Sequence, residues 1–279
     1  MYNVSFPGLG INDLQINPIV FSSGGFRITW YGVIIATGLV LAMIYAMTVC
    51  KKRYGIDSDK LLNCVIVGLI TAIIGARLYY VAFEWDTYSK DLSKIFSINE
   101  GGLAIYGGLI GALVGGLIVA KICRVNIPAL LDLAVLGFLI GQGIGRWGNF
   151  TNQEAFGTPT DLPWGMISEN TGGVTVHPCF LYESLWCLLG FVLLHFFSKY
   201  LRKYDGQVFL MYLVWYGAER MVVEGLRTDS LMTPIFNLRV SQVLSAVLVV
   251  IGLVFLIINF IRKKDTIDVP VKRLERKKA

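Results

Sequence analysis

Long apolar runs, separated by short polar segments, make up most of this chain. A helix of about 20 apolar residues is long enough to cross the roughly 30 Å hydrocarbon core of a membrane. The pattern therefore predicts an all-α integral membrane protein, a single polytopic domain over residues 1–279 with seven spans. The predicted spans are residues 30–50, 61–83, 102–123, 130–149, 180–197, 208–224 and 240–261.

Two polar segments outside the predicted spans are long. The first 29 residues lack the basic start and the small-residue cleavage pattern of a signal peptide, so we expect an uncleaved segment on the outer side. Residues 150–177 are rich in Gly, Pro, Thr and Asn and have no helical period. This composition predicts a small irregular or short-stranded cap over the outer face.

Glycines recur at helical spacing in two of the predicted spans. In the third span, Gly107, Gly111 and Gly115 stand four residues apart, a spacing that lets helices approach closely in lipid. At the end of the fourth span, the glycines of residues 141–148 are expected to thin the helix on one side or to unwind it.

Charge orients the predicted spans, because Lys and Arg in short loops tend to stay in the cytoplasm. The loops after the first, third and fifth spans carry four, two and three basic residues, and residues 262–279 carry eight. We therefore expect the N-terminus outside and a basic C-terminal tail in the cytoplasm. The net charge of +6 then reflects topology and not binding to nucleic acid.

Cysteine and histidine content gives no support for a metal site. The five cysteines form no CxxC pair, and four lie in or beside apolar spans, which favours small buried hydrophobic residues. The two histidines, His177 and His195, lie on opposite sides of one span, so we expect no histidine-based metal site.

Polar side chains within or beside the predicted spans are the main functional signal. A charged residue deep in a span costs at least about 2.5 to 3.5 kcal/mol, so it must be paired, reach the interface or serve a function. With the orientation above, these residues fall in the outer halves, which predicts one polar cavity open to the outer leaflet. They are Tyr31, Arg77, Tyr106, Arg146, Asn149, Asn152, Glu154, His177, Tyr182, Glu183, Arg220 and Glu224.

Arg146 and Arg220 fit a phosphate ligand, because a guanidinium is permanently charged and donates paired hydrogen bonds. In a cavity that faces lipid, this indicates a phospholipid headgroup. The residues alone leave alternatives open. Arg146 could pair with Glu154 to hold the following loop, and Arg220 could pair with Glu224 on the next helical turn. Arg77 fits a structural brace as well as a ligand contact.

A set of motifs from residue 30 to about residue 229 resembles the bacterial prolipoprotein diacylglyceryl transferases. The family signature G-R-x-G-N-F-x-N-x-E-x-x-G reads GRWGNFTNQEAFG at residues 145–157. The further matches are WYG at 30–32, GARLYYV at 75–81, GGLAIYGGLIG at 101–111, HPCFLYE at 177–183 and ERMVVEGLR at 219–227.

The resemblance implies an enzyme that moves the diacylglyceryl group of phosphatidylglycerol onto the thiol of a lipobox cysteine in a prolipoprotein. The products would be a thioether and glycerol phosphate. It implies a multi-pass protein of the bacterial plasma membrane, with membrane lipids around it and no metal or other cofactor, and we expect a monomer. The alternative class is a membrane lipid transporter or flippase, which would line both halves of the membrane with polar residues.

The resemblance also implies roles for individual residues. The expected catalytic residues are Arg146, Arg220, Tyr106, Glu154 and Asn149. The expected substrate-binding residues are Arg146, Tyr31, Arg77, Asn152, Glu224, Tyr182 and His177.

The chain departs from many of these relatives at Tyr106, where they carry a histidine before the two glycines. An essential histidine base at this position is therefore excluded. A free tyrosine is a poor base at neutral pH. Either Tyr106 acts as a perturbed phenolate or a hydrogen-bonding guide, or the arginines lower the barrier without a dedicated base. We favour the second.

Overall fold

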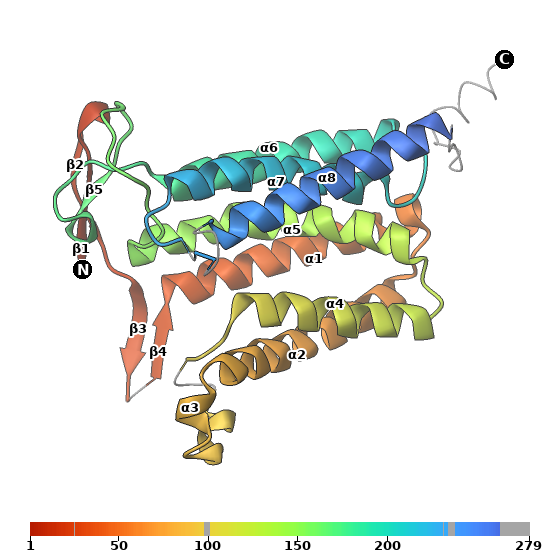
Figure 1. The fold of residues 1–279 in the computed structure, drawn as a ribbon, viewed down its shortest axis with the longest axis horizontal. Helices are drawn as coiled ribbons and strands as arrows, with labels where there is room; N and C mark the ends of the chain where they lie inside the picture. The colour runs from red at the N-terminus through yellow and green to blue at the C-terminus, as the bar shows by residue number, and fades with distance from the viewer. Residues whose placement is uncertain (25, 98–100, 231, 234–237, 263–279) are drawn as a thin grey trace. The chain divides into compact units, whose positions relative to one another are not determined.

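The computed structural model is built mainly of helices (Figure 1) and describes the chain except residues 25, 98–100, 231, 234–237 and 263–279. It contains two compact units. The first consists of Met1–Ala46 and Leu131–Ala279, and the second of Met47–Leu130. The helices are α1 (Trp30–Tyr54), α2 (Ser58–Phe83), α3 (Trp85–Tyr88), α4 (Ile105–Ile122), α5 (Ile127–Asn152), α6 (Cys179–Tyr200), α7 (Gln207–Leu226) and α8 (Val240–Ile261), with short 3-10 turns η1 (Pro7–Leu9), η2 (Leu92–Phe96) and η4 (Glu169–Thr171).

Six helices among the described residues are long and apolar enough to cross a membrane. They are α1, α2, α4, α5, α6 and α8. The prediction of a mostly helical protein with several candidate membrane spans is therefore confirmed, and the helix ends shift by only a few residues. The sixth predicted span coincides with α7, which carries the charged residues Glu219, Arg220 and Glu224. The count of seven spans stays a prediction.

The second unit is built around the close packing of α2 against α4. A Cβ atom added at Gly75 would lie 2.4 Å from the carbonyl oxygen of Gly107, and one at Gly111 would lie 2.1 Å from that of Thr71. These distances leave no room for a side chain, so the backbones touch only because both positions are glycine. The close helix contact predicted from the glycine spacing is confirmed.

In the first unit, α6 packs on α7 and α7 packs on α8. Helix α5 is the most buried of the six candidate spans and remains helical through its glycines to Asn152. A Cβ atom at Gly143 would lie 2.9 Å from Cγ of Leu188 on α6, and one at Gly148 would lie 2.8 Å from the ring of Tyr31 on α1. The glycines therefore thin α5 and let its neighbours approach, without unwinding it.

A buried carboxylate on α5 caps the beginning of α7. Asp132 is 0% exposed and accepts the backbone N–H of Gly206 at 2.9 Å and of Phe209 at 2.8 Å. Its Oδ2 also forms an ion pair with Arg202 at 3.3 Å. The first backbone N–H groups of a helix have no partner within the helix, so Asp132 supplies acceptors that α7 lacks.

Replacing Asp132 with alanine is expected to lower the free energy of unfolding by about 3 to 5 kcal/mol, because the buried Arg202 would lose its buried partner and the backbone N–H groups of Gly206 and Phe209 would lose their acceptor. Thermal unfolding of the purified protein in detergent measures this effect. The matched control is Asp205→Ala, because Asp205 contacts the same arginine at 3.4 Å with its side chain 30% exposed. We expect less than about 1 kcal/mol from the control. Equal effects of the two variants would contradict the capping role.

The described residues before α1 form strands that the hydrophobic pattern did not predict (Figure 1). Strands β1 (Tyr2–Phe6), β2 (Ile11–Ile16) and β5 (Ile167–Ser168) make an antiparallel sheet in the order β2-β1-β5, and β3 (Ile19–Ser23) pairs with β4 (Phe26–Thr29). Val4 on β1 packs with Met166, Val176 and Phe180 in a small apolar core. This core ties the N-terminal strands to the otherwise irregular segment that follows α5.

Candidate functional site

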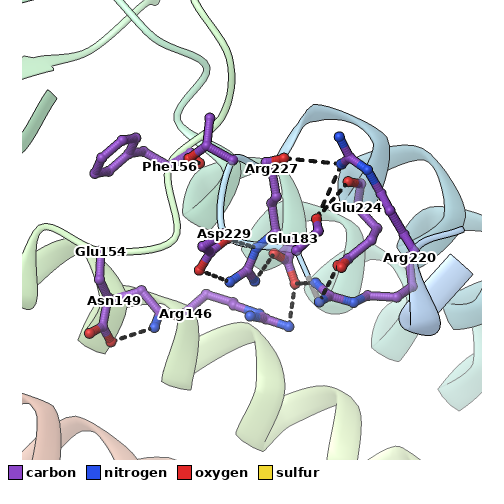
Figure 2. Close-up of polar contacts among 12 residues, drawn as sticks. Arg146, Asn149, Glu154, Phe156, Glu183, Arg220, Glu224, Arg227 and Asp229 are labelled. Atoms are coloured by element: carbon purple, nitrogen blue, oxygen red, sulfur yellow. Dashed lines mark hydrogen bonds and ion pairs between the residues drawn. The ribbon is translucent and has the colours of Figure 1, made fainter. Parts of the chain in front are cut away.

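Arginines and carboxylates from α5, α6 and α7 converge around one residue, Glu183 (Figure 2). Its side chain is 1% exposed, and its Oε2 contacts both Nη2 of Arg146 and, at 3.3 Å, Nη1 of Arg220. Its Oε1 lies 3.8 Å from Nη1 of Arg227. One buried carboxylate thus contacts three guanidinium groups, which would otherwise repel one another.

The register of the helices brings these side chains together. Between α5 and α6, Trp147 donates its ring N–H to Ser184 at 3.1 Å, and Ser184 donates to the carbonyl of Gly143 at 2.7 Å. Between α6 and α7, the rings of Trp186 and Trp215 stack, and each ring N–H donates to the other residue's carbonyl. These side chain to backbone bonds fix where Glu183 stands along both neighbouring helices.

Two further carboxylates complete the cluster. Oε2 of Glu224 lies 2.5 Å from Nη2 of Arg220, one helical turn away. Asp229 accepts two hydrogen bonds from Arg227, at 2.8 and 2.7 Å. The bonds from Arg227 hold the pKa of the Asp229 carboxyl below its usual range, so this carboxylate is charged at neutral pH. The pairing of Arg220 with Glu224, left open by the sequence, is therefore present, but it is one part of a larger network.

Arg146 differs from the neighbouring arginines because most of its N–H donors are not used by other described residues. A guanidinium has five N–H donors. Within the described part of the chain, the ion pair with Glu183 is the one polar contact of the Arg146 side chain, which is 18% exposed. The alternative pairing with Glu154 is not formed, since Glu154 accepts a hydrogen bond from Asn149 at 2.8 Å. Arg146 is thus charged, held in place and able to bind an anion.

Arg77, in the second unit, has the opposite character. It is 5% exposed, and its donors all reach backbone carbonyls, at 2.6 to 3.2 Å. The accepting residues are Lys94, Ile95, Ser97, Gly101 and Gly102. With its donors used in this way, Arg77 holds together the segment between α3 and α4.

Replacing Arg77 with lysine is expected to destabilise the protein by about 3 kcal/mol, because an ammonium group cannot reach all the carbonyls that the guanidinium satisfies. The thermal midpoint of the purified variant measures the change. Arg27→Lys, at an exposed position on β4, serves as the control and should leave the midpoint unaltered. An unchanged midpoint for Arg77→Lys, combined with weaker lipid binding, would instead assign Arg77 to the ligand.

The other predicted site residues lie in different parts of the structure. Tyr31 is in the first turn of α1 with its ring against Gly148, and Asn152 ends α5. Trp164 donates to the hydroxyl of Tyr182 at 2.8 Å, and Nδ1 of His177 lies 3.1 Å from the same hydroxyl. Tyr106, in the first turn of α4, belongs with Arg77 to the second unit.

Comparison with known proteins adds a family to this geometry. The family model described as Prolipoprotein diacylglyceryl transferase matches residues 18–258, which is most of the chain. The chain belongs to this family. Relatives named phosphatidylglycerol--prolipoprotein diacylglyceryl transferase include one from Finegoldia magna, 45% identical over 236 residues (85% of this chain, 93% of the relative), and one from Clostridioides difficile, 44% identical over 236 residues (85% and 92%). A third, from Streptococcus pyogenes, is 43% identical over 255 residues (87% and 95%).

In this member of the prolipoprotein diacylglyceryl transferase family, the sequence alone did not identify Glu183 as the residue at the centre of the arginines. Glu183 was noted only as one polar residue among many, and Asp229 was not considered. The available signal was charge balance. Two arginines predicted for one cavity require buried carboxylates nearby, and Glu183 is the buried carboxylate that α6 supplies.

Proposed function

We propose that this chain transfers the diacylglyceryl group of phosphatidylglycerol to the lipobox cysteine of a prolipoprotein, the first step of bacterial lipoprotein maturation. Membership of the family and the names of its relatives support the reaction. The observation that carries the assignment of the site is the cluster in which Arg146, largely unpaired, stands beside Arg220 around one buried carboxylate.

In the proposed reaction, the cysteine sulfur attacks the glycerol carbon that bears the phosphate. The S–C bond forms, the C–O bond to the phosphate breaks, and the electron pair of that bond goes to the phosphate oxygen. Charge therefore grows on the leaving phosphate as the bond breaks. Preorganised donors at the point where charge develops give the largest stabilisation in such a step.

Arg146 and Arg220 hold that phosphate in our proposal. Both guanidiniums contact the same oxygen of Glu183, so their free donors lie close enough together to bind one anion. Glu224, one turn further along the same helix, positions Arg220 through their ion pair. Glu183 keeps the positive charges together and uses only part of the donors of Arg146.

The remaining predicted residues take supporting roles in this proposal. Asn149 and Glu154, hydrogen-bonded to each other at the end of α5, bind hydroxyl groups of the headgroup. Tyr31 and Asn152 border the headgroup, and the hydrogen-bonded pair of His177 and Tyr182 anchors the segment that follows α5. Arg77 supports its own loop, and Tyr106 guides the thiol.

The same proposal places the chain in the bacterial plasma membrane as a monomer with seven spans, α7 included. The basic loops then face the cytoplasm together with the C-terminal tail, and the N-terminus lies outside. Residues 150–177 cap the outer face. The arginine cluster, by which we mean Arg146, Arg220 and Arg227 around Glu183, opens to the outer leaflet. A lipid transporter would need polar groups exposed along the whole path. The ion pair of Asp132 and Arg202 at the other end of α5 is buried and engaged in capping α7.

The test is an assay of the purified protein with vesicles of phosphatidylglycerol and a lipobox peptide. We expect a peptide that gains the diacylglyceryl mass in a thioether, together with an equal amount of glycerol phosphate. A peptide with serine in place of the cysteine, and vesicles of phosphatidylcholine, are the controls. Folded protein that makes no thioether from phosphatidylglycerol would refute the proposal.

A further inference from the structure

Glu219 is a buried carboxylate without a partner. It lies on α7 immediately before Arg220 and is 5% exposed. Both of its carboxylate oxygens are buried and receive no hydrogen bond from the described residues. The other carboxylates around the arginines, Glu183, Glu224 and Asp229, all form ion pairs. Glu219 is therefore the exception within an otherwise paired cluster.

Glu219 lies among the charged residues of the arginine cluster. From α5 it meets the charge of Arg146, and from α6 those of Glu183 and the Cys187 thiol. On its own helix the nearby groups are Tyr212, Tyr216 and Arg220. Helix α8 packs on α7 at Gly217, where its nearest residues are Ser245 and Val249, neither of which carries a charge.

A buried carboxylate that accepts no hydrogen bond is unfavourable for folding. Replacement by an apolar side chain of similar size removes that cost. Stability of the fold therefore does not explain a glutamate at position 219. Buried ionisable groups without a partner are often found at sites where a proton moves. The position of Glu219 beside the proposed phosphate site points to a role in the reaction.

The reaction needs such a group, because the nucleophile is the thiolate and not the thiol. Glu183, Glu224 and Asp229 are already engaged in ion pairs with guanidiniums. Glu219 is the carboxylate of this cluster whose oxygens remain available to a proton.

We propose that Glu219 accepts the proton of the lipobox thiol, an inference that rests on the proposed function. The proton moves from sulfur to a carboxylate oxygen of Glu219, the thiolate attacks the glycerol carbon, and the C–O electron pair passes to the phosphate held by the arginines. Glu219 then gives the proton to the departing glycerol phosphate. Atoms and charge balance without any further reactant, and Glu219 returns to its starting state.

The test compares two peptides on wild-type protein and on Glu219→Gln. Glutamine keeps the shape of glutamate but cannot accept a proton, so kcat with the cysteine peptide is expected to fall by about 100- to 10,000-fold. The KM for phosphatidylglycerol should remain within about threefold. A peptide with selenocysteine at the lipobox position carries a more acidic group that is already ionised at neutral pH. With this selenocysteine peptide, the kcat of Glu219→Gln should lie within about tenfold of the kcat of the wild-type protein.

Two further variants separate this role from a structural one. Glu219→Leu should be inactive with the cysteine peptide, yet unfold at the same temperature as wild type or higher, because it removes an unpaired buried charge. Glu169→Gln, an exposed position on η4, is the control and should behave as wild type in both assays.

Near-normal activity of Glu219→Gln with the cysteine peptide would overturn the proposal. Equal losses with the cysteine and selenocysteine peptides would also overturn it, and would show that Glu219 acts on binding or structure instead. Both outcomes leave the proposed transferase reaction intact. Wild-type protein that lipidates neither peptide would refute the proposed function itself, and the role of Glu219 with it.

Discussion

Replacing Arg146 with alanine is expected to lower kcat by at least about a thousandfold. The guanidinium would contribute about 4 kcal/mol to the leaving phosphate, a value typical of one preorganised donor group at a developing oxyanion. Lysine at this position should recover little of the loss, because it keeps the charge but not the paired donors that a phosphate accepts. The rate of glycerol phosphate release at saturating phosphatidylglycerol measures the effect.

The fold should survive the loss of Arg146, because Glu183 keeps its contacts with Arg220 and Arg227. An unchanged thermal midpoint of Arg146→Ala, with Arg27→Ala as the exposed arginine control, checks this point. Near-normal turnover of a folded Arg146→Ala protein would remove Arg146 from the phosphate site and leave it as a structural partner of Glu183.

The second large effect is expected from Glu183→Gln. Arg146 would then lose its ion-pair partner, Arg220 would keep only Glu224 and Arg227 only Asp229, and the three guanidiniums would move apart. We expect kcat to fall by about a hundredfold, in keeping with the loss of a positioned electrostatic group. The KM for phosphatidylglycerol should stay the same or fall, because the cluster gains a net positive charge that attracts an anionic lipid.

A lower kcat with an unchanged or lower KM distinguishes a positioning role from collapse of the site, since collapse would raise KM. The matched control is Asp229→Asn, which removes a carboxylate of the same cluster whose side chain is 51% exposed and which pairs with Arg227 alone among the three arginines. Its effect on kcat should stay below about fivefold. A hundredfold loss in Asp229→Asn, or a rise in KM for Glu183→Gln, would contradict the central position of Glu183.

The helices were predictable from the sequence because their signal is local. A long and mostly apolar run such as residues 240–261 predicts α8 to the residue, and the bounds of α5 differ from the predicted ones by three residues at each end. The strands of residues 1–29 were not predictable in this way. β1 is short, its partner β5 lies at residues 167–168, and only the folded chain brings the two together.

The site was predictable in part, for a similar reason. The cost of a charge within a membrane span singles out Arg146 and Arg220 in the sequence. The number of donors that remain unpaired cannot be read from the sequence, because the partners come from other helices. Arg77 and Arg146 look alike in the chain, yet the first is fully bonded to a loop and the second is largely free for a ligand.

The most direct test of the central claim is an experimental structure of the wild-type protein with phosphatidylglycerol bound and no peptide present, so that the lipid is not consumed. We expect the phosphate within hydrogen-bonding distance of the guanidiniums of both Arg146 and Arg220, with Glu183 still between them. A phosphate bound elsewhere, with Arg146 and Arg220 contacting only Glu183 and Glu224, would contradict the account.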